Sequence, residues 1–284
     1  MSQSPTFLIV LGPTGSGKSV LPQKVSKYLG MSKMFNNKKT VKILIDDLVE
    51  QSPYYKQFVL KDIASYKTKA ERNRSFINPS PQKLKAYDKA YFTARSGKPC
   101  KINVPDTCNQ FNDKLLEEGL KKGANIVFES TGRFFPEWIF KYYLEALNKK
   151  KYNVVFAWGT VDLCELLKRN KLRALKSVLE FMKDQAKPAP RLPDITRKKY
   201  VGLLKEIIET FYKAIEEGGY IKQTAGVLRK PPRVLVFDNR NRGINVLFDS
   251  SHPELSGEET AKSAMDIYNI GIKQCPQNES SYGK

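Results

Sequence analysis

The octapeptide GPTGSGKS at residues 12–19 fits the pattern G-x-x-x-x-G-K-[ST] at every fixed position. An apolar, β-branched run at 6–11 precedes it, and a segment typical of a helix follows it. Gly12, Gly15 and Gly17 let the backbone turn so that consecutive N–H groups can point at phosphate oxygens. We therefore predict a Walker A phosphate-binding loop, or P-loop. Its residues are Gly12, Pro13, Thr14, Gly15, Ser16, Gly17, Lys18, Ser19 and Val20.

Two side chains of this loop have a defined chemistry. We expect Lys18 to bridge the β- and γ-phosphates of a nucleoside triphosphate, and the Ser19 hydroxyl to ligate Mg²⁺. ATP and Mg²⁺ are therefore the predicted cofactors. The motif alone does not separate kinases from ATPases or GTPases.

Carboxylates follow two further predicted strands. Asp46 and Asp47 end the apolar run at 41–45, and Glu129 ends the run at 125–128. Ligands of open α/β sheets bind beyond the carboxyl ends of the strands, so these acids are placed to accept a proton from an attacking hydroxyl or to hold a Mg²⁺-bound water. Capping of the next helix is the alternative role. Two adjacent acids exceed what a helix cap needs, which favours function for the pair.

A third group of candidate residues is basic. Eleven lysines and arginines lie between residues 167 and 200, in a predicted helix at 162–184, a Pro-punctuated loop at 186–194 and the start of another helix. Arg169 and Arg173 are i, i+4 neighbours and share one face of the first helix. Arginine forks stabilise the charge that develops on a transferring phosphoryl group. We expect two or three of these arginines to act in that way, while the other basic residues are ordinary solvated charges.

The elements that must position these residues alternate along the chain. The predicted strands are 6–11, 41–45, 125–128, 153–157, 233–237 and 245–248. The predicted helices are 17–29, most of 54–122, a segment after Pro136, 162–184 and 196–217. Such alternation predicts an α/β fold, a P-loop NTPase three-layer sandwich with a mostly parallel sheet and a helical insertion. We expect a single domain over 1–272, with the insertion at about 54–107, a lid-like basic segment at about 165–199 and a loose polar tail at 273–284.

The composition adds constraints on partners. Against 29 acidic residues the chain carries 49 basic ones, a formal net charge of +20 over 284 residues. Such a field attracts phosphates, nucleic acid or an anionic surface, although it also serves solubility. The only histidine, His252, lies in a polar segment and is expected in a surface loop. A catalytic base must therefore be a carboxylate, Lys, Tyr or Cys.

The cysteines bear on the cellular compartment. Cys100, Cys108, Cys164 and Cys275 show no C-x-x-C spacing and no neighbouring histidines, which argues against zinc and predicts free thiols in a reducing compartment. The chain has no apolar run of membrane-spanning length, and its first residues lack the features of a signal peptide. We expect a cytoplasmic protein without membrane partners.

Six ordered motifs resemble those of one family. GPTGSGKS, IDDL, IVFESTGR, LKRNKLR, APRLPD and VFDNRNRG resemble the zeta-toxin-like P-loop kinases over roughly 6–50 and 108–250. Known members of that family phosphorylate UDP-N-acetylglucosamine, and the wider group includes chloramphenicol phosphotransferase-like and polynucleotide-kinase-like enzymes. The Walker motif is not specific to the family, whereas E-S-T-G-R after a strand is more so. Most of the weight comes from the order and spacing of the six.

The resemblance implies roles for individual residues. Asp46, with Asp47 as the alternative, looks like the acid that deprotonates the substrate hydroxyl. The implied substrate contacts are Asp113, Glu129, Thr131 and Arg133. The implied phosphate clamp consists of Arg169 (or Arg173) and Arg191. The implied neighbours of the adenine are Asn239 and Arg240.

The acceptor stays open at this point. The stretch from Asp46 to Glu129 is 83 residues, longer than in toxin-type members and rich in Lys and Tyr at 61–98, and Asp113 stands where the family usually has Glu. Three functions are compatible with the sequence. The leading one is a kinase for an anionic small molecule, with UDP-N-acetylglucosamine as the first candidate. The others are a nucleic-acid end kinase and a non-catalytic nucleotide-binding module. An antitoxin or other protein partner is not specified by these residues.

Overall fold

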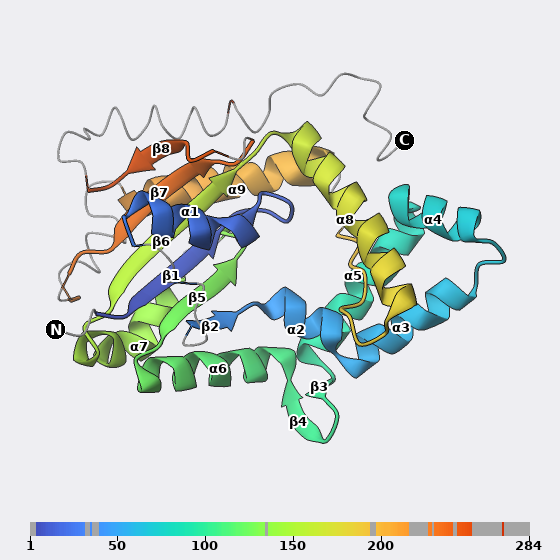
Figure 1. Ribbon diagram of the computed structural model, residues 1–284, viewed down its shortest axis with the longest axis horizontal. Coiled ribbons are helices and arrows are strands. Elements are labelled where there is room, and N and C mark those ends of the chain that lie inside the picture. The colour runs from blue at the N-terminus through green and yellow to red at the C-terminus, as the bar shows by residue number, and fades with distance from the viewer. Residues whose placement is uncertain are drawn as a thin grey trace. The chain divides into compact units, whose positions relative to one another are not determined.

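The chain divides into two compact units in the computed structural model (Figure 1). The structure describes residues 4–31, 35, 40–133, 136–193, 197–215, 227–228, 230–240, 243–251 and 269. Unit 1 comprises 1–43, 116–163 and 198–274, and unit 2 comprises 44–115, 164–197 and 275–284. His252, Cys275 and the predicted tail at 273–284 lie outside the described residues.

A six-stranded sheet forms the centre of unit 1, with the strand order β2-β5-β1-β6-β7-β8. The strands are β1 (Thr6–Leu11), β2 (Thr40–Ile43), β5 (Asn125–Ser130), β6 (Asn153–Thr160), β7 (Arg233–Asp238) and β8 (Val246–Asp249). The first five in this order pair in parallel, and β8 pairs antiparallel with β7. Every residue of β1 is buried, because helices cover both faces of a parallel sheet.

Helices pack on both faces of this sheet. On one face, Leu21 and Val25 of α1 (Leu21–Tyr28) pack against Leu8 and Val10 of β1. On the other face, aromatic side chains of β6 contact two helices. Phe156 meets Phe140 of α7 (Glu137–Lys149) with ring centroids 5.9 Å apart. Trp158 meets Phe211 of α9 (Arg197–Ile215) at 5.5 Å. The predicted α/β fold, with a mostly parallel sheet between two helical layers, is confirmed.

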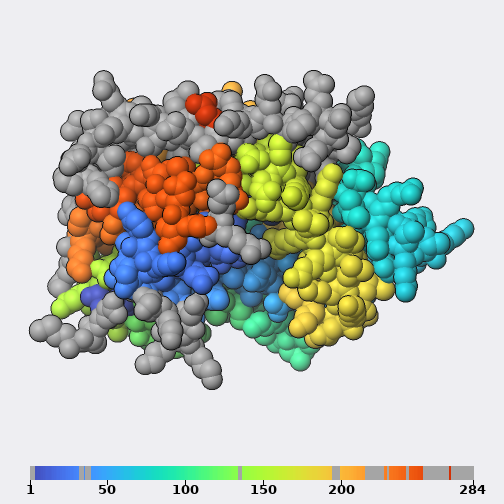
Figure 2. Space-filling model, turned by 45° about the horizontal axis from the view of Figure 1, so that its top comes forward, coloured from blue at the N-terminus to red at the C-terminus, as the bar shows by residue number. Residues whose placement is uncertain are grey.

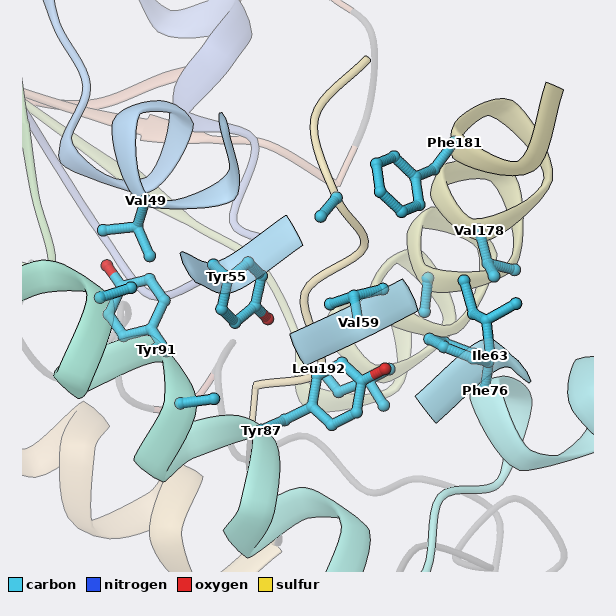
Figure 3. Packing of buried hydrophobic residues seen from close by; sticks show 14 of the residues in the cluster. Val49, Tyr55, Val59, Ile63, Phe76, Tyr87, Tyr91, Val178, Phe181 and Leu192 are labelled. Carbon is cyan, nitrogen blue, oxygen red and sulfur yellow. The ribbon is translucent and has the colours of Figure 1, made fainter. Parts of the chain in front are cut away.

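Unit 2 is built mainly from helices. They are α2 (Ile45–Gln51), α3 (Pro53–Ala64), α4 (Lys69–Ile77), α5 (Pro81–Ser96) and α8 (Leu163–Lys183). A hairpin of β3 (Pro99–Lys101) and β4 (Val104–Thr107) leads into α6 (Cys108–Lys122), which runs from unit 2 into unit 1. Ser52, Thr68 and Ser80 cap α3, α4 and α5 by accepting a backbone hydrogen bond at the first turn. The core of unit 2 includes Tyr55, Val59, Phe76, Tyr87 and Phe181 (Figure 3).

Two predicted strand ends differ from the structure. β2 ends at Ile43, so Asp46 and Asp47 lie in the first turn of α2 instead of after a strand that runs to residue 45. Carboxylates at this position are favoured by the positive end of the helix, which explains where α2 begins. Glu129 lies within β5, which extends to Ser130, instead of following the strand.

The prediction of free thiols is wrong for three cysteines. Cys100 and Cys108 form a disulfide, with Cα atoms 4.6 Å apart, and Cys164 is disulfide-bonded as well. The β3–β4 hairpin brings the first two together across only eight positions of sequence, a geometry that spacing alone did not indicate. Disulfides persist mainly in oxidising compartments, so cysteine usage no longer supports a cytoplasmic location. No helix among the described residues combines the length and the apolar character needed to cross a membrane.

Candidate functional site

The P-loop of unit 1 has the backbone conformation that its sequence predicts. It connects β1 to a short 3₁₀ turn at Lys18–Val20 and then to α1. Gly12, Gly15 and Gly17 have positive φ values of 142°, 93° and 85°. A Cβ on Gly12 would lie 2.5 Å from Ser16 Oγ and 2.8 Å from the carbonyl oxygen of Gly159. Glycine is therefore required there both for its φ angle and for the space it leaves.

The side chain of Lys18 folds back onto this loop. Its ammonium donates to the carbonyl oxygens of Gly12 at 2.8 Å and Pro13 at 3.2 Å. It also pairs with Glu129 Oε1 at 3.2 Å, and the lysine side chain is 8% exposed. Glu129 reaches it because β5 pairs with β1 in the register that sets Glu129 beside Val10. The structure therefore brings together Lys18 and Glu129, two residues that the sequence predicted separately.

A second set of contacts, made by residues at and just after the C-terminal end of β7, fixes the P-loop. Asn239 Nδ2 donates to the carbonyl oxygen of Ser16 at 2.8 Å, and buried Lys24 donates to Asn239 Oδ1 at 2.9 Å. Arg240 pairs with Asp238 at 2.6 Å. Burial by itself would raise the pKa of Asp238, but the hydrogen bonds from Arg240 lower it below its ordinary value. Asn239 thus holds the P-loop in place through Ser16, a contact that the sequence did not predict. That Asn239 and Arg240 contact the adenine remains a prediction.

The donors at this loop fit a nucleoside triphosphate with its Mg²⁺. In the described part of the chain, the buried atom Ser16 Oγ of this loop has no hydrogen-bond partner. Unused polar atoms of this kind are costly unless something else satisfies them. The side chains of Ser19 and Val20 are exposed, which leaves the Ser19 hydroxyl open to a metal ion. Lys18, the loop N–H groups and Ser19 would hold the phosphates and the metal.

The turn after β5 carries Thr131 and Arg133, both exposed. Thr131 Oγ1 accepts a long hydrogen bond of 3.4 Å from the backbone of Arg133. Arg133 Nη2 donates to Glu206 of α9 at 3.0 Å, and its carbonyl oxygen accepts from Thr210 at 2.8 Å. The predicted substrate contacts therefore lie on a turn that α9 anchors through Glu206, a residue that no sequence motif marked.

In unit 2, Asp46 and Arg191 form an ion pair. Asp46 Oδ1 also accepts a hydrogen bond of 2.5 Å from the Tyr91 hydroxyl, and the Arg191 guanidinium stands 4.1 Å from the centre of the Tyr91 ring. Burial alone would lower the pKa of Arg191, but the Asp46 carboxylate and nearby groups raise it. The predicted base and one predicted phosphate clamp thus contact each other. Asp47 is exposed on the same helix.

Glu50 is a buried acid of α2 that sequence reasoning missed. Its Oε1 accepts from Arg173 Nη2 at 2.9 Å, and its carbonyl oxygen accepts from the backbone of Ala189 at 2.8 Å. Burial raises the pKa of Glu50 to about 7, against the opposing effects of Arg173 and Arg191. The spacing of Asp46 and Glu50, one helical turn apart, was the available signal. It was hidden because the first residues of α2 were read as a strand end.

The remaining predicted residues of unit 2 are less enclosed. Arg169 pairs with Glu165 of its own helix at 2.8 Å, and Asp113 is exposed on α6. Together with the pairs of Arg191 and Arg173, this means that each arginine predicted to clamp phosphates is ion-paired with a carboxylate of α2 or α8.

Fold and loop together define a P-loop NTPase-type α/β protein. No protein-family model and no curated protein matches the sequence. Among solved structures, the chain is similar to one from the PezAT chromosomal toxin-antitoxin system of the human pathogen Streptococcus pneumoniae. The TM-score is 0.50 and the sequence identity 14%, over 99% of this chain and 83% of that one. At this identity the similarity supports the fold.

Proposed function

We propose that the protein is an ATP-dependent phosphotransferase, a kinase that phosphorylates a hydroxyl of an anionic small molecule. The observation that carries the proposal is Lys18, fixed inside a loop of positive-φ glycines and paired with Glu129. The carboxylates and arginines of unit 2 favour phosphoryl transfer over nucleotide binding alone, since binding does not require a proton acceptor. UDP-N-acetylglucosamine is the first candidate acceptor, from the resemblance to zeta-toxin-like kinases. Similarity to a chain of a toxin–antitoxin system is compatible with this choice.

Each residue of the proposed site would have its own role in phosphoryl transfer. Lys18 and the loop N–H groups neutralise and orient the phosphates. Asp46 accepts the proton of the acceptor hydroxyl as that oxygen bonds to the γ-phosphorus and the bond to the departing ADP breaks. Arg191 and Arg173 offset the charge of the transferring group. ATP supplies the phosphoryl group, and Ser19 would hold a Mg²⁺ ion, which would offset phosphate charge. Thr131 and Arg133 hold the acceptor.

Transfer of label from γ-labelled ATP tests this proposal. The acceptors are UDP-N-acetylglucosamine, other nucleotide sugars, nucleosides and 5′-hydroxyl oligonucleotides. We expect Lys18→Ala and Asp46→Asn each to slow transfer by about 100-fold or more. Lys27→Ala, which removes an exposed charge from the same stretch of chain as Lys18, should stay within about twofold of the wild type.

The outcomes separate the parts of the proposal. Near-normal transfer by Asp46→Asn would show that another group takes the proton. Label on oligonucleotides alone would make the protein a nucleic-acid end kinase. No label on any acceptor, from a folded protein that binds ATP, would refute the kinase assignment and leave a nucleotide-binding module.

A further inference from the structure

A pocket of about 710 Å³ lies among α3, α4 and α5 of unit 2. None of its lining residues belongs to the predicted nucleotide or substrate contacts. Its volume lies within the range of small-molecule binding sites. In Figure 2 the segment that carries α4, in cyan, extends to the molecular surface, and Figure 3 shows Tyr87 among the side chains of the adjoining core.

The inner wall of this pocket is a fixed polar network. Lys83 Nζ donates to Asp62 Oδ2 at 2.8 Å, to the Tyr66 hydroxyl at 2.9 Å and to Ser75 Oγ at 2.9 Å. The Tyr87 hydroxyl donates to the same Asp62 oxygen at 2.8 Å. The Lys83 side chain is 8% exposed. A buried ion pair of this kind is a weak source of stability, and its value lies in holding the surrounding groups in one arrangement.

The rim carries unpaired positive charge. Lys61 on α3 and Arg74 on α4 are exposed, and neither side chain makes a hydrogen bond or ion pair with the described part of the chain. Of the two acids that line the pocket, Asp62 is engaged by Lys83 and Glu71 accepts a backbone hydrogen bond at 3.2 Å. The pocket therefore presents two available cations, which favours an anionic ligand. An arginine fork suits phosphate in particular.

Aromatic side chains at the pocket indicate a second feature of the ligand, a planar ring. Phe58 and Tyr66 line the pocket and are partly exposed, so a planar ring can contact them. Base–aromatic contacts tolerate any base, because every base has a π-face. The segment 61–98 that supplies most of the lining carries ten basic residues against three acidic ones.

We propose that this pocket binds a nucleotide unit, with its phosphate at Lys61 and Arg74 and its base against Phe58 and Tyr66. The unit belongs either to a single-stranded nucleic acid or to a free nucleotide. This binding goes beyond the proposed phosphotransfer and does not depend on the P-loop.

Fluorescence anisotropy with a labelled single-stranded 12-nucleotide RNA tests the proposal, with UMP as competitor. The test variant is Lys61→Ala/Arg74→Ala. The matched control is Lys85→Ala/Lys89→Ala, which removes the same charge from exposed positions of α5 that do not line the pocket. We expect the test variant to bind about tenfold more weakly and the control to change by less than about twofold. The slope of log affinity against log salt should become shallower by about 0.7 in the test variant, because the contact with one phosphate is lost.

Each outcome is decisive. RNA binding without competition by UMP identifies a nucleic-acid segment as the ligand, and efficient competition identifies a free nucleotide. Equal weakening in both double variants would overturn the proposal in favour of general charge attraction. Absence of RNA binding, together with absence of UMP binding in calorimetry, would overturn it as well. Lys18→Ala should bind the RNA like the wild type. If it does not, the binding belongs to the P-loop and the pocket proposal fails, whatever the kinase assay gives. Circular dichroism melts confirm that all variants are folded.

Discussion

Glu50 offers the sharpest test of the electrostatics of unit 2. Its carboxylate is buried beside Arg173, and burial raises its pKa to about 7 from an ordinary value of 4.5. The substitution Glu50→Gln keeps the size and hydrogen-bonding capacity of the side chain but removes its titration. Its effect on the free energy of unfolding should therefore depend on pH.

The expected magnitude follows from the shift. A difference of about 2.5 pKa units corresponds to about 3 kcal/mol, at about 1.4 kcal/mol per unit. The folded state holds this proton more tightly than the unfolded state, so between the two pKa values it binds more protons. The contribution of Glu50 to stability therefore falls as pH rises from 4.5 to about 7, and the full cost is present above that range. As pH rises from 4.5 to 8, the free energy of unfolding of Glu50→Gln should increase by up to about 3 kcal/mol relative to that of the wild type.

Urea unfolding followed by circular dichroism at a series of pH values measures this difference. Glu180→Gln is the control, since Glu180 is an exposed acid of α8 whose side chain is 54% accessible. Its stability should follow the wild-type pH profile. A difference between Glu50→Gln and the wild type that stays constant across this range would refute the reasoning.

Further predictions concern unit 1 and the disulfide. Gly159→Ala places a Cβ 2.6 Å from the amide nitrogen that holds the P-loop, so it should cost about 1–3 kcal/mol and weaken ATP binding in calorimetry. Gly202→Ala, with no atom within 4 Å on α9, should instead stabilise by about 0.5–1 kcal/mol in the same urea melts. Replacing Cys100 and Cys108 by Ser should lower the free energy of unfolding by about 2–3 kcal/mol. A reductant should destabilise the wild type by more than this variant, which keeps only the disulfide of Cys164. Asp249 accepts hydrogen bonds from Arg233 and its neighbours, and these outweigh burial and lower the pKa of Asp249 below its ordinary 3.8. The stabilisation from the Asp249 carboxylate is therefore lost as pH falls below that value. Asp249→Asn should flatten the acid side of the plot of unfolding free energy against pH.

The sequence predicted best what depends on neighbouring residues. The P-loop is local: its glycines, Lys18 and flanking elements lie within a few residues, and all were found in the predicted places. The strands of the unit 1 sheet were also recognised, because apolar β-branched runs mark a buried parallel sheet, whereas β3 and β4 were not. The pairing of the strands was not predicted. The contact of Lys18 with Glu129 depends on the register of β5 against β1, which the sequence did not indicate.

Contacts between distant segments were beyond local reasoning. Arg173 meets Glu50 across 123 positions of sequence, and Asn239 meets Ser16 across 223. The types of the arginines and acids indicated phosphate chemistry, but nothing in the sequence indicated which acid each arginine contacts. The start of α2 was missed for a local reason, because the apolar residues before Asp46 continue the pattern of β2.

The ion pairs of α2 place a condition on the proposed chemistry. If Arg173 and Arg191 turn to phosphates, Glu50 and Asp46 must give up their cations. Glu50 can do so without leaving a bare buried charge, because a pKa of about 7 lets it take up a proton as Arg173 leaves. Asp46 keeps the Tyr91 hydroxyl as a donor. Phosphate binding by these arginines should therefore be linked to proton uptake near pH 7, and Glu50→Gln should remove that pH dependence from the ATP affinity. An affinity whose pH profile is the same in variant and wild type would show that Arg173 stays on Glu50.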